Sequence, residues 1–140
     1  MANEAWEALF RAQATVHREL LAADVWDGLA PSEYGVLYEL SKAPDGVRIT
    51  TLSEDVLLTQ AGISRLVARL ETAGLVERVA DPADGRASRI RLTEAGAAAQ
   101  RRVGLRHGRH VAQIMTRTFS TEQLRQLREL SKTLTESART

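Results

Sequence analysis

The sequence predicts a mainly α-helical fold that carries one small β-hairpin. Apolar residues recur every three or four positions over most of the chain, which is typical of amphipathic helices. Between residues 75 and 92 the spacing changes to a strand-like run and then to strict alternation, with turn dipeptides in between. A length of 140 residues, with 44% hydrophobic and 26% charged side chains, indicates one soluble globular domain.

Three helices are expected in the first part of the chain. The first covers 3–23 and the second covers 31–41, where a proline at the first helical position favours a helix start. The third covers 51–57, because Thr51 and Glu54 fit a capping box.

A fourth helix, over 60–73, is the one with the clearest boundaries. Thr59 is a suitable N-cap, and Gly74 is a suitable C′ glycine. One face of this helix is apolar, formed by Ile63, Leu66, Val67 and Leu70.

The hairpin is predicted from two strands, 75–79 and 88–92, joined by a loop over 80–87. In the second strand Ile90 and Leu92 share one face, so Arg89 and Arg91 share the other. Three short helices followed by a two-stranded hairpin are the order of elements in a winged helix-turn-helix. We therefore expect a winged-helix lobe over 30–93.

Two further helices, over 94–117 and 121–138, are expected after the hairpin. Together with the first helix they carry more apolar surface than the lobe is able to cover. We expect the segments 1–29 and 94–140 of this single domain (1–140) to dimerise with a second copy. The side chains expected in that contact are Trp6, Leu9, Phe10, Phe119, Leu124, Leu127 and Leu134.

Composition excludes several classes of function. The chain has no cysteine, so disulfides, thiolate metal sites and thiol redox sensing are excluded. No apolar run approaches the ~18 residues of a membrane span, and the first residues lack the basic start of a secretory signal. From these two absences we expect the protein in the cytoplasm. No nucleophile–base pair or glycine-rich phosphate loop is evident, so we expect that the protein is not an enzyme.

The charge is distributed unevenly along the chain. Residues 1–58 carry 4 basic and 10 acidic side chains, whereas residues 59–117 carry 11 basic and 5 acidic ones. This asymmetry is expected if one surface faces a polyanion. Arginine outnumbers lysine 17 to 2, which suits phosphate and guanine recognition but also follows from a GC-rich genome.

The outer face of the 60–73 helix is the first candidate for DNA contact. Small residues there allow close approach to a major groove, and glutamine and arginine reach adenine and guanine edges. An ordinary solvated helix face is the alternative. The candidate DNA-binding residues in and before this helix are Thr59, Gln60, Ala61, Gly62, Ser64, Arg65 and Arg69.

The hairpin loop is the second candidate, although a generic surface hairpin is the alternative. Arg86 at its tip is placed to enter a minor groove, whose negative potential attracts arginine. Arg89 and Arg91 are placed to meet phosphates. Asp84 is expected to have a structural role in the wing, orienting a nearby arginine through a charge-assisted hydrogen bond.

Several motifs resemble the MarR family of transcriptional regulators. They are the 59–78 segment, Asp84-Gly-Arg86 in the wing, and Leu92-Thr-Glu-Ala-Gly96 after it. The resemblance implies a homodimeric winged-helix repressor on a pseudo-palindromic operator. It places the family's recognition positions on Gln60, Ala61, Ser64, Arg65 and Arg69, and its wing arginine on Arg86. Ala61 and Gly85 depart from the serine and the basic residue that many members have there.

The resemblance also implies a small aromatic or anionic effector, bound between the dimer helices and the DNA-binding lobe. The residues that would border such a pocket are Arg11, His17, Trp26, Tyr34 and Tyr38. The alternative is that Tyr34 and Tyr38 are core residues of their helix. The absence of cysteine excludes the family's peroxide-sensing branch on chemical grounds.

Two weaker features complete the sequence. His107 and His110 lie three apart on a helix, but too few other ligands lie nearby for a metal site, so we expect no metal and no cofactor. Gly104 and Gly108 permit either a close helix approach or a bend.

The competing hypothesis for function is a winged-helix module that binds an acidic protein instead of DNA.

Overall fold

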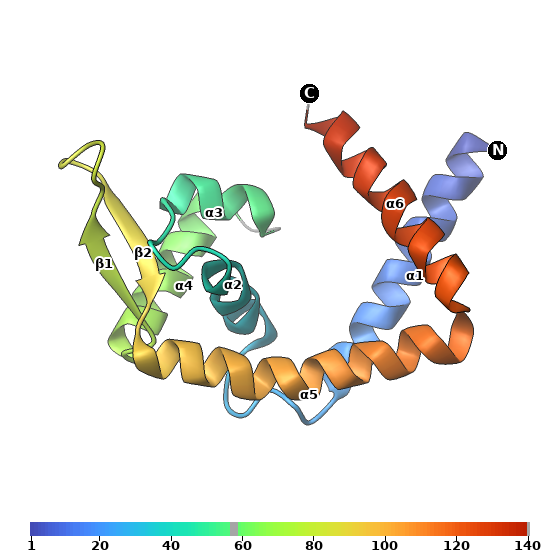
Figure 1. Cartoon of the computed structure of the whole chain (residues 1–140), viewed down its shortest axis with the longest axis horizontal. Helices are drawn as coiled ribbons and strands as arrows, with labels where there is room; N and C mark the ends of the chain where they lie inside the picture. The colour runs from blue at the N-terminus through green and yellow to red at the C-terminus, as the bar shows by residue number, and fades with distance from the viewer. Residues whose placement is uncertain (57–58, 140) are drawn as a thin grey trace. The chain divides into compact units, whose positions relative to one another are not determined.

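The computed structural model describes residues 1–56 and 59–139 (Figure 1). The described chain forms two compact units, one from residues 23–106 and one from residues 1–22 together with those from 107 onward. The first unit extends beyond the predicted 30–93 lobe at both ends. In chain order the elements are α1 (Ala2–Ala22), α2 (Pro31–Ser41), α3 (Ile49–Asp55), α4 (Gln60–Thr72), β1 (Val76–Ala80), β2 (Ser88–Leu92), α5 (Glu94–Thr118) and α6 (Thr121–Ala138).

The 23–106 unit has a closed hydrophobic core. Helices α2, α3 and α4 each bury one face in it, and β2 contributes Ile90, which is completely buried. The predicted apolar face of α4 is confirmed, since all four of its residues lie in this core. The core residues are Val36, Leu37, Leu40, Leu52, Ile63, Leu66, Val67, Leu70, Val76, Ile90 and Ala99.

The hairpin is antiparallel, with Val76 opposite Leu92 and Ala80 opposite Ser88. Its base is fixed to the lobe by an isolated bridge between Val47 and Ile90, whose backbone groups exchange hydrogen bonds of 2.9 and 2.8 Å. Gly46 makes this bridge possible. Its φ is +88°, and a Cβ there would lie 2.8 Å from the carbonyl oxygen of Ile90.

Side-chain caps start three of the helices. The Thr59 hydroxyl accepts a hydrogen bond from the Gly62 amide (3.0 Å) at α4, and the Thr93 hydroxyl accepts one from Gly96 (3.1 Å) at α5. Ser120 forms a capping box with Gln123 at α6. Gly74 has the expected left-handed conformation, with φ +73°.

The predicted start of α3 is wrong. The helix begins at Ile49, with Arg48 as an N-cap that makes no side-chain cap bond, so the Thr51–Glu54 capping box does not form. Because Leu52 is buried and the Val47 bridge fixes the preceding chain, the tertiary contacts decide where this helix begins. The hairpin loop also begins one residue later than predicted, at Asp81.

The other unit contains α1, the end of α5, and α6. Arg117 joins α5 to α1 through an ion pair with Glu19 at 2.9 Å. Among its described residues only Ile114 is a buried hydrophobic, and neither α1 nor α6 has a buried residue. Large side chains are left exposed instead: Trp6 (63%), Phe10 (60%), Leu130 (71%) and Leu134 (51%). No helix in the described chain has the length and apolar character needed to cross a membrane.

Candidate nucleic-acid interface

Helix α4 presents the predicted polar face to solvent. Ala61, Arg65 and Arg69 are exposed and Ser64 is half-buried, opposite the face that packs in the core. Gly62 donates its amide to the cap. The hydroxyl of Thr59 is occupied by that same bond, which gives this residue a structural role at the helix start. The backbone of Gln60 begins the helix, but its side chain lies outside the described residues.

At the tip of the hairpin, the hydrogen bonds that Asp84 accepts in the described chain come from backbone amides and not from an arginine side chain. Its Oδ1 accepts a hydrogen bond from the Arg86 amide at 3.0 Å, and its carbonyl oxygen accepts one from the Ala87 amide at 3.0 Å. The expectation that Asp84 orients an arginine side chain therefore has no support in the hydrogen bonds of the described chain. These bonds instead fix the turn that leaves Arg86 exposed.

The carboxylate that orients arginine side chains is Asp81, at the start of the loop. Its Oδ2 accepts hydrogen bonds from the Nε of Arg48 (2.7 Å) and of Arg89 (3.2 Å). Its Oδ1 accepts from the amides of Ala83 (2.8 Å) and Asp84 (3.3 Å). Only 1% of this side chain is exposed. The bond from Arg48, then that from Ala83, holds the pKa of Asp81 well below its usual range.

This cluster is not predicted from the sequence, in which the turn dipeptides between residues 75 and 92 indicate only a loop and neither Asp81 nor Arg48 has an assigned role. An aspartate at the first position of a tight turn was the available signal, since Asp side chains often bond the amides two and three residues later. The partner arginines were beyond such reasoning because Arg48 lies 33 residues away along the chain.

Apart from Arg89, which pairs with Asp81, the arginines of α4 and the hairpin fall into two groups. Arg91 pairs with Glu77 (2.7 Å) and Arg78 pairs with Glu71 (3.3 Å), so their charges are balanced by exposed carboxylates. Arg65, Arg69 and Arg86 are exposed, and none of them forms an ion pair with a side chain that the structure describes. Among the described side chains, this part of the unit therefore presents three guanidinium groups without a carboxylate partner.

The expected effector-pocket residues are divided between the two units. Trp26, Tyr34 and Tyr38 belong to the 23–106 unit and form a row, with ring centroids 5.8 and 6.2 Å apart. Arg11 and His17 are exposed on α1, in the other unit, where Arg11 pairs with Glu7 at 2.6 Å.

The two tyrosines of this row differ in burial. Tyr34 is 8% exposed, whereas Tyr38 is 44% exposed and carries the Lys42 ammonium 4.2 Å from its ring centroid. Burial raises the pKa of Tyr34, although a hydrogen bond with Gln100 opposes the rise. Tyr34 packs closely against α5 at Gly104, where a Cβ would lie only 3.2 Å from the Tyr34 hydroxyl oxygen. Tyr34 is thus a core residue, and Tyr38 is open to solvent.

The two histidines of α5 are half-buried. Burial, and then the charge of nearby His110, lowers the pKa of His107. His110 Nε2 lies 4.0 Å from a carboxylate oxygen of Glu19. Within the described part of the chain no three histidine, aspartate or glutamate side chains gather as metal ligands would.

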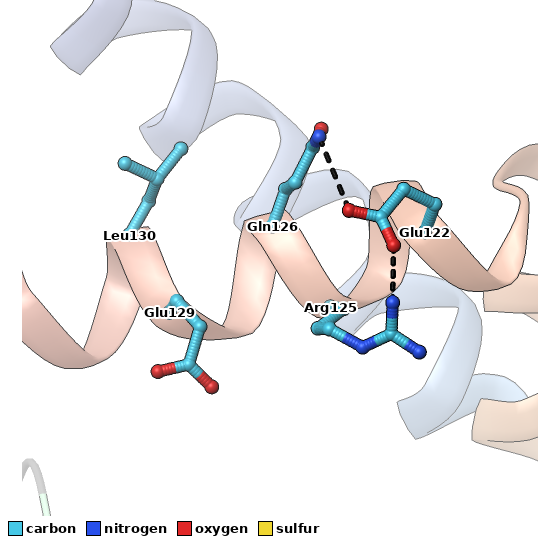
Figure 2. Close-up of a pocket in the computed structure, with 5 residues that line it drawn as sticks. All are labelled: Glu122, Arg125, Gln126, Glu129 and Leu130. Atoms are coloured by element: carbon cyan, nitrogen blue, oxygen red, sulfur yellow. Dashed lines mark hydrogen bonds and ion pairs between the residues drawn. The ribbon is translucent and has the colours of Figure 1, made fainter.

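Helix α6 carries a shallow hollow of about 370 Å³ on its surface. Figure 2 shows Glu122 linked to both Arg125 and Gln126, with Leu130 one turn further along the helix. Leu130 is the apolar part of this surface and is largely exposed. Both carboxylates of the hollow are paired with arginines, Glu122 with Arg125 and Glu129 with Arg128, and the hollow lies next to the exposed Leu134.

Comparisons with known proteins agree with this geometry. A family model described as "MarR family" matches residues 27–87, which include α2 to α4, β1 and the hairpin loop. The transcriptional regulator HosA from Escherichia coli O111:H- is 35% identical over 68 residues. That match spans about half of this chain and half of HosA.

Solved structures match over nearly the whole chain. The PcaV transcriptional regulator from Streptomyces coelicolor is 30% identical, with 95% of this chain and 96% of PcaV covered and a TM-score of 0.66. PcaV with its natural ligand is also similar (TM-score 0.72, 29% identity, 93% and 91% covered). Sco3205, a MarR family transcriptional regulator from the same organism in complex with DNA, has a TM-score of 0.75 at 28% identity, with 98% and 88% covered.

Proposed function

Because this chain belongs to the MarR family of transcriptional regulators, we propose that it is a homodimeric regulator that binds duplex DNA with sequence preference. The observation that carries the proposal is a trio of exposed arginines that have no carboxylate partner among the described side chains: Arg65 and Arg69 on α4, and Arg86 on the hairpin. The structural relative Sco3205 was solved in complex with DNA.

In this proposal α4 reads the major groove. The small side chain of Ala61 lets the start of the helix approach the base edges. Arg65 and Arg69 extend from the same exposed face, and arginine reads guanine through two hydrogen bonds. The hairpin carries Arg86 toward the adjacent minor groove, where the potential is most negative.

Dimerisation follows from the unit made by α1, the end of α5, and α6. Apart from Ile114, its described hydrophobic side chains are not buried within the chain, and four of the largest are more than half exposed. A second copy supplies the same surface by two-fold symmetry. Two α4 helices ~34–36 Å apart would then meet successive major grooves of a pseudo-palindromic site.

Repression and release by a small ligand are the finer parts of the proposal. PcaV was solved with its natural ligand, and the aromatic row of this chain offers Tyr38 as an exposed wall. An amphipathic aromatic acid suits such a wall. We expect the protein to act in the cytoplasm, where it would reach chromosomal DNA.

The test is selection of DNA from a random duplex library, followed by titration of the selected site. Arg86→Ala should weaken binding by ~1–3 kcal/mol, the range for one good contact. Arg91→Ala is the matched control, because Arg91 is on the same hairpin but already paired with Glu77, and it should have little effect. Failure of the wild-type protein to select or bind any duplex, with an acidic protein bound instead, would support the protein-interaction module.

A further inference from the structure

A second cationic site lies where the two strands of the hairpin meet the hairpin loop, beside Asp81 and Arg89. It is a hollow of about 370 Å³, lined by the loop before α3, the start of the hairpin loop, and β2. All of these segments belong to the 23–106 unit. The charged residues that line it are Arg48, Asp81 and Arg89.

We propose that Arg48 and Arg89, both held by the buried carboxylate of Asp81, form a clamp for one backbone phosphate of the bound DNA. The proposal rests on the DNA-binding function above and adds a contact to it. From the sequence, Arg89 is expected to meet phosphates from the outer face of its strand. In this arrangement it forms one half of the clamp. Arg48 is a further DNA-binding residue, and Asp81 is a positioning residue.

The hydrogen bonds define how the two side chains are held. Each arginine uses Nε to reach the same oxygen of Asp81, at 2.7 and 3.2 Å. A guanidinium has five N–H donors in one plane, so the Nη groups are left for another acceptor. In the described part of the chain no hydrogen bond engages these Nη groups, while 44% of the Arg48 side chain and 31% of the Arg89 side chain is exposed.

The charges of the cluster favour an anion. Two guanidinium groups face one carboxylate, which leaves a surplus of one positive charge, and only 1% of the Asp81 side chain is exposed to an incoming ligand. Asp84 is the other nearby carboxylate, and its charge acts on Arg48. Two planar donors fixed by a shared acceptor suit a phosphate, which takes hydrogen bonds from arginine at two oxygens.

Continuity with the α4–hairpin surface favours a DNA phosphate over a free anion. Arg48 immediately precedes α3, which packs beside α4, and Asp81 begins the loop that carries Arg86. Figure 1 shows the chain that leads into α3 lying next to β2, as the Val47–Ile90 bridge requires. A DNA strand that meets Arg86 in the hairpin loop would pass this site, because Asp81 begins the same loop and Arg89 follows it by one residue in β2.

The experiment measures affinity for the selected duplex against salt concentration. Each phosphate contact contributes ~0.9 to the slope of log K against log [salt]. Arg48→Gln should lower the slope by ~0.9 for each protomer, with a loss of affinity on every sequence and an unchanged base preference. Arg48→Lys keeps the charge and should retain most of the slope.

The matched control is Arg78→Gln. Arg78 is on the same hairpin, its side chain is 39% exposed, and its Nε lies 3.3 Å from a carboxylate oxygen of Glu71, which is itself exposed. Arg78→Gln should leave the salt slope unchanged. Because Arg48→Gln also removes a partner of Asp81, thermal unfolding of each variant is recorded, and the comparison is made well below the transition.

Two results would overturn the proposal. In the first, the wild type binds duplex DNA but Arg48→Gln keeps its salt slope, which rejects the clamp and leaves the proposed function intact. In the second, inorganic phosphate alone stabilises the wild type but not Arg48→Gln, while the DNA slope is unchanged; the site would then serve a free anion. A wild type that binds no duplex at all rejects the proposed function itself.

Discussion

Gly96 is the residue at which a single added methyl group should have the largest effect. It lies in the first turn of α5, where an ideal Cβ would come 1.8 Å from the carbonyl oxygen of Leu75. A Cβ does not come closer than 3.0 Å to such an atom, so the start of α5 and the backbone of Leu75 must move apart by at least ~1.2 Å. The same carbonyl accepts a hydrogen bond from the Thr93 amide at 3.1 Å, and this bond would break.

The expected size of the effect follows from three contributions. Forced backbone movement in a packed region costs ~1–3 kcal/mol, and loss of the Thr93–Leu75 hydrogen bond adds ~1 kcal/mol. Alanine in a helix recovers ~0.5–1 kcal/mol relative to glycine. Gly96→Ala should therefore lower the free energy of unfolding by ~1–3.5 kcal/mol.

Urea unfolding followed by circular dichroism measures this change directly. Gly35→Ala is the matched control: Gly35 is also inside a helix, but a Cβ there meets nothing within 4 Å. That variant should gain ~0.5–1 kcal/mol from helix propensity alone. If Gly96→Ala were as stable as the wild type, the close approach of α5 to residue 75 would be refuted.

Three further predictions concern the caps, the buried carboxylate and the dimer. Thr59→Ala removes the side-chain cap of α4 and should lower the free energy of unfolding by ~0.5–2 kcal/mol; an unchanged urea midpoint would contradict the cap. The folded-state pKa of Asp81 lies below its ordinary 3.8, so its stabilising effect is present above that value and lost as the pH falls through the folded pKa. The stability difference between wild type and Asp81→Asn should thus be constant from pH 7 to about 5 and shrink below 3.8, as urea titrations at each pH would reveal. Trp6→Glu places a charge on the exposed apolar face of α1 and should shift sedimentation from dimer to monomer; a persisting dimer would locate the contact elsewhere.

Local signals in the sequence were sufficient for most of the fold. The α4 helix was predictable because the cap at Thr59, the apolar spacing and the stop at Gly74 all agree. The strand 88–92 was predictable because its alternation matches the buried Ile90 and the outward Arg89 and Arg91. Exposure of Arg65 and Arg69 followed from the helical periodicity of α4, and exposure of Arg86 followed from its place in the hairpin loop.

What the sequence concealed depends on contacts between distant segments. The capping box at Thr51 was a sound local signal, but burial of Leu52 and the Val47–Ile90 bridge place the helix start at Ile49. The role of Asp81 could not be predicted because its two arginine partners come from a different loop and a different strand. Asp84, which lies in the same loop, was the more conspicuous residue, and its side chain accepts the Arg86 amide in the described structure.

The unit that contains α1 and α6 buries only Ile114 among its described hydrophobic residues. This makes the protein concentration in the cell important for its folding. If these helices find their packing only in a second copy, their folding free energy is supplied by association, and mass action governs both. Dilution would then loosen the helices at the same concentrations at which it separates the pair. A regulator built in this way would respond to its own abundance, with occupancy of a two-fold site falling more steeply than concentration.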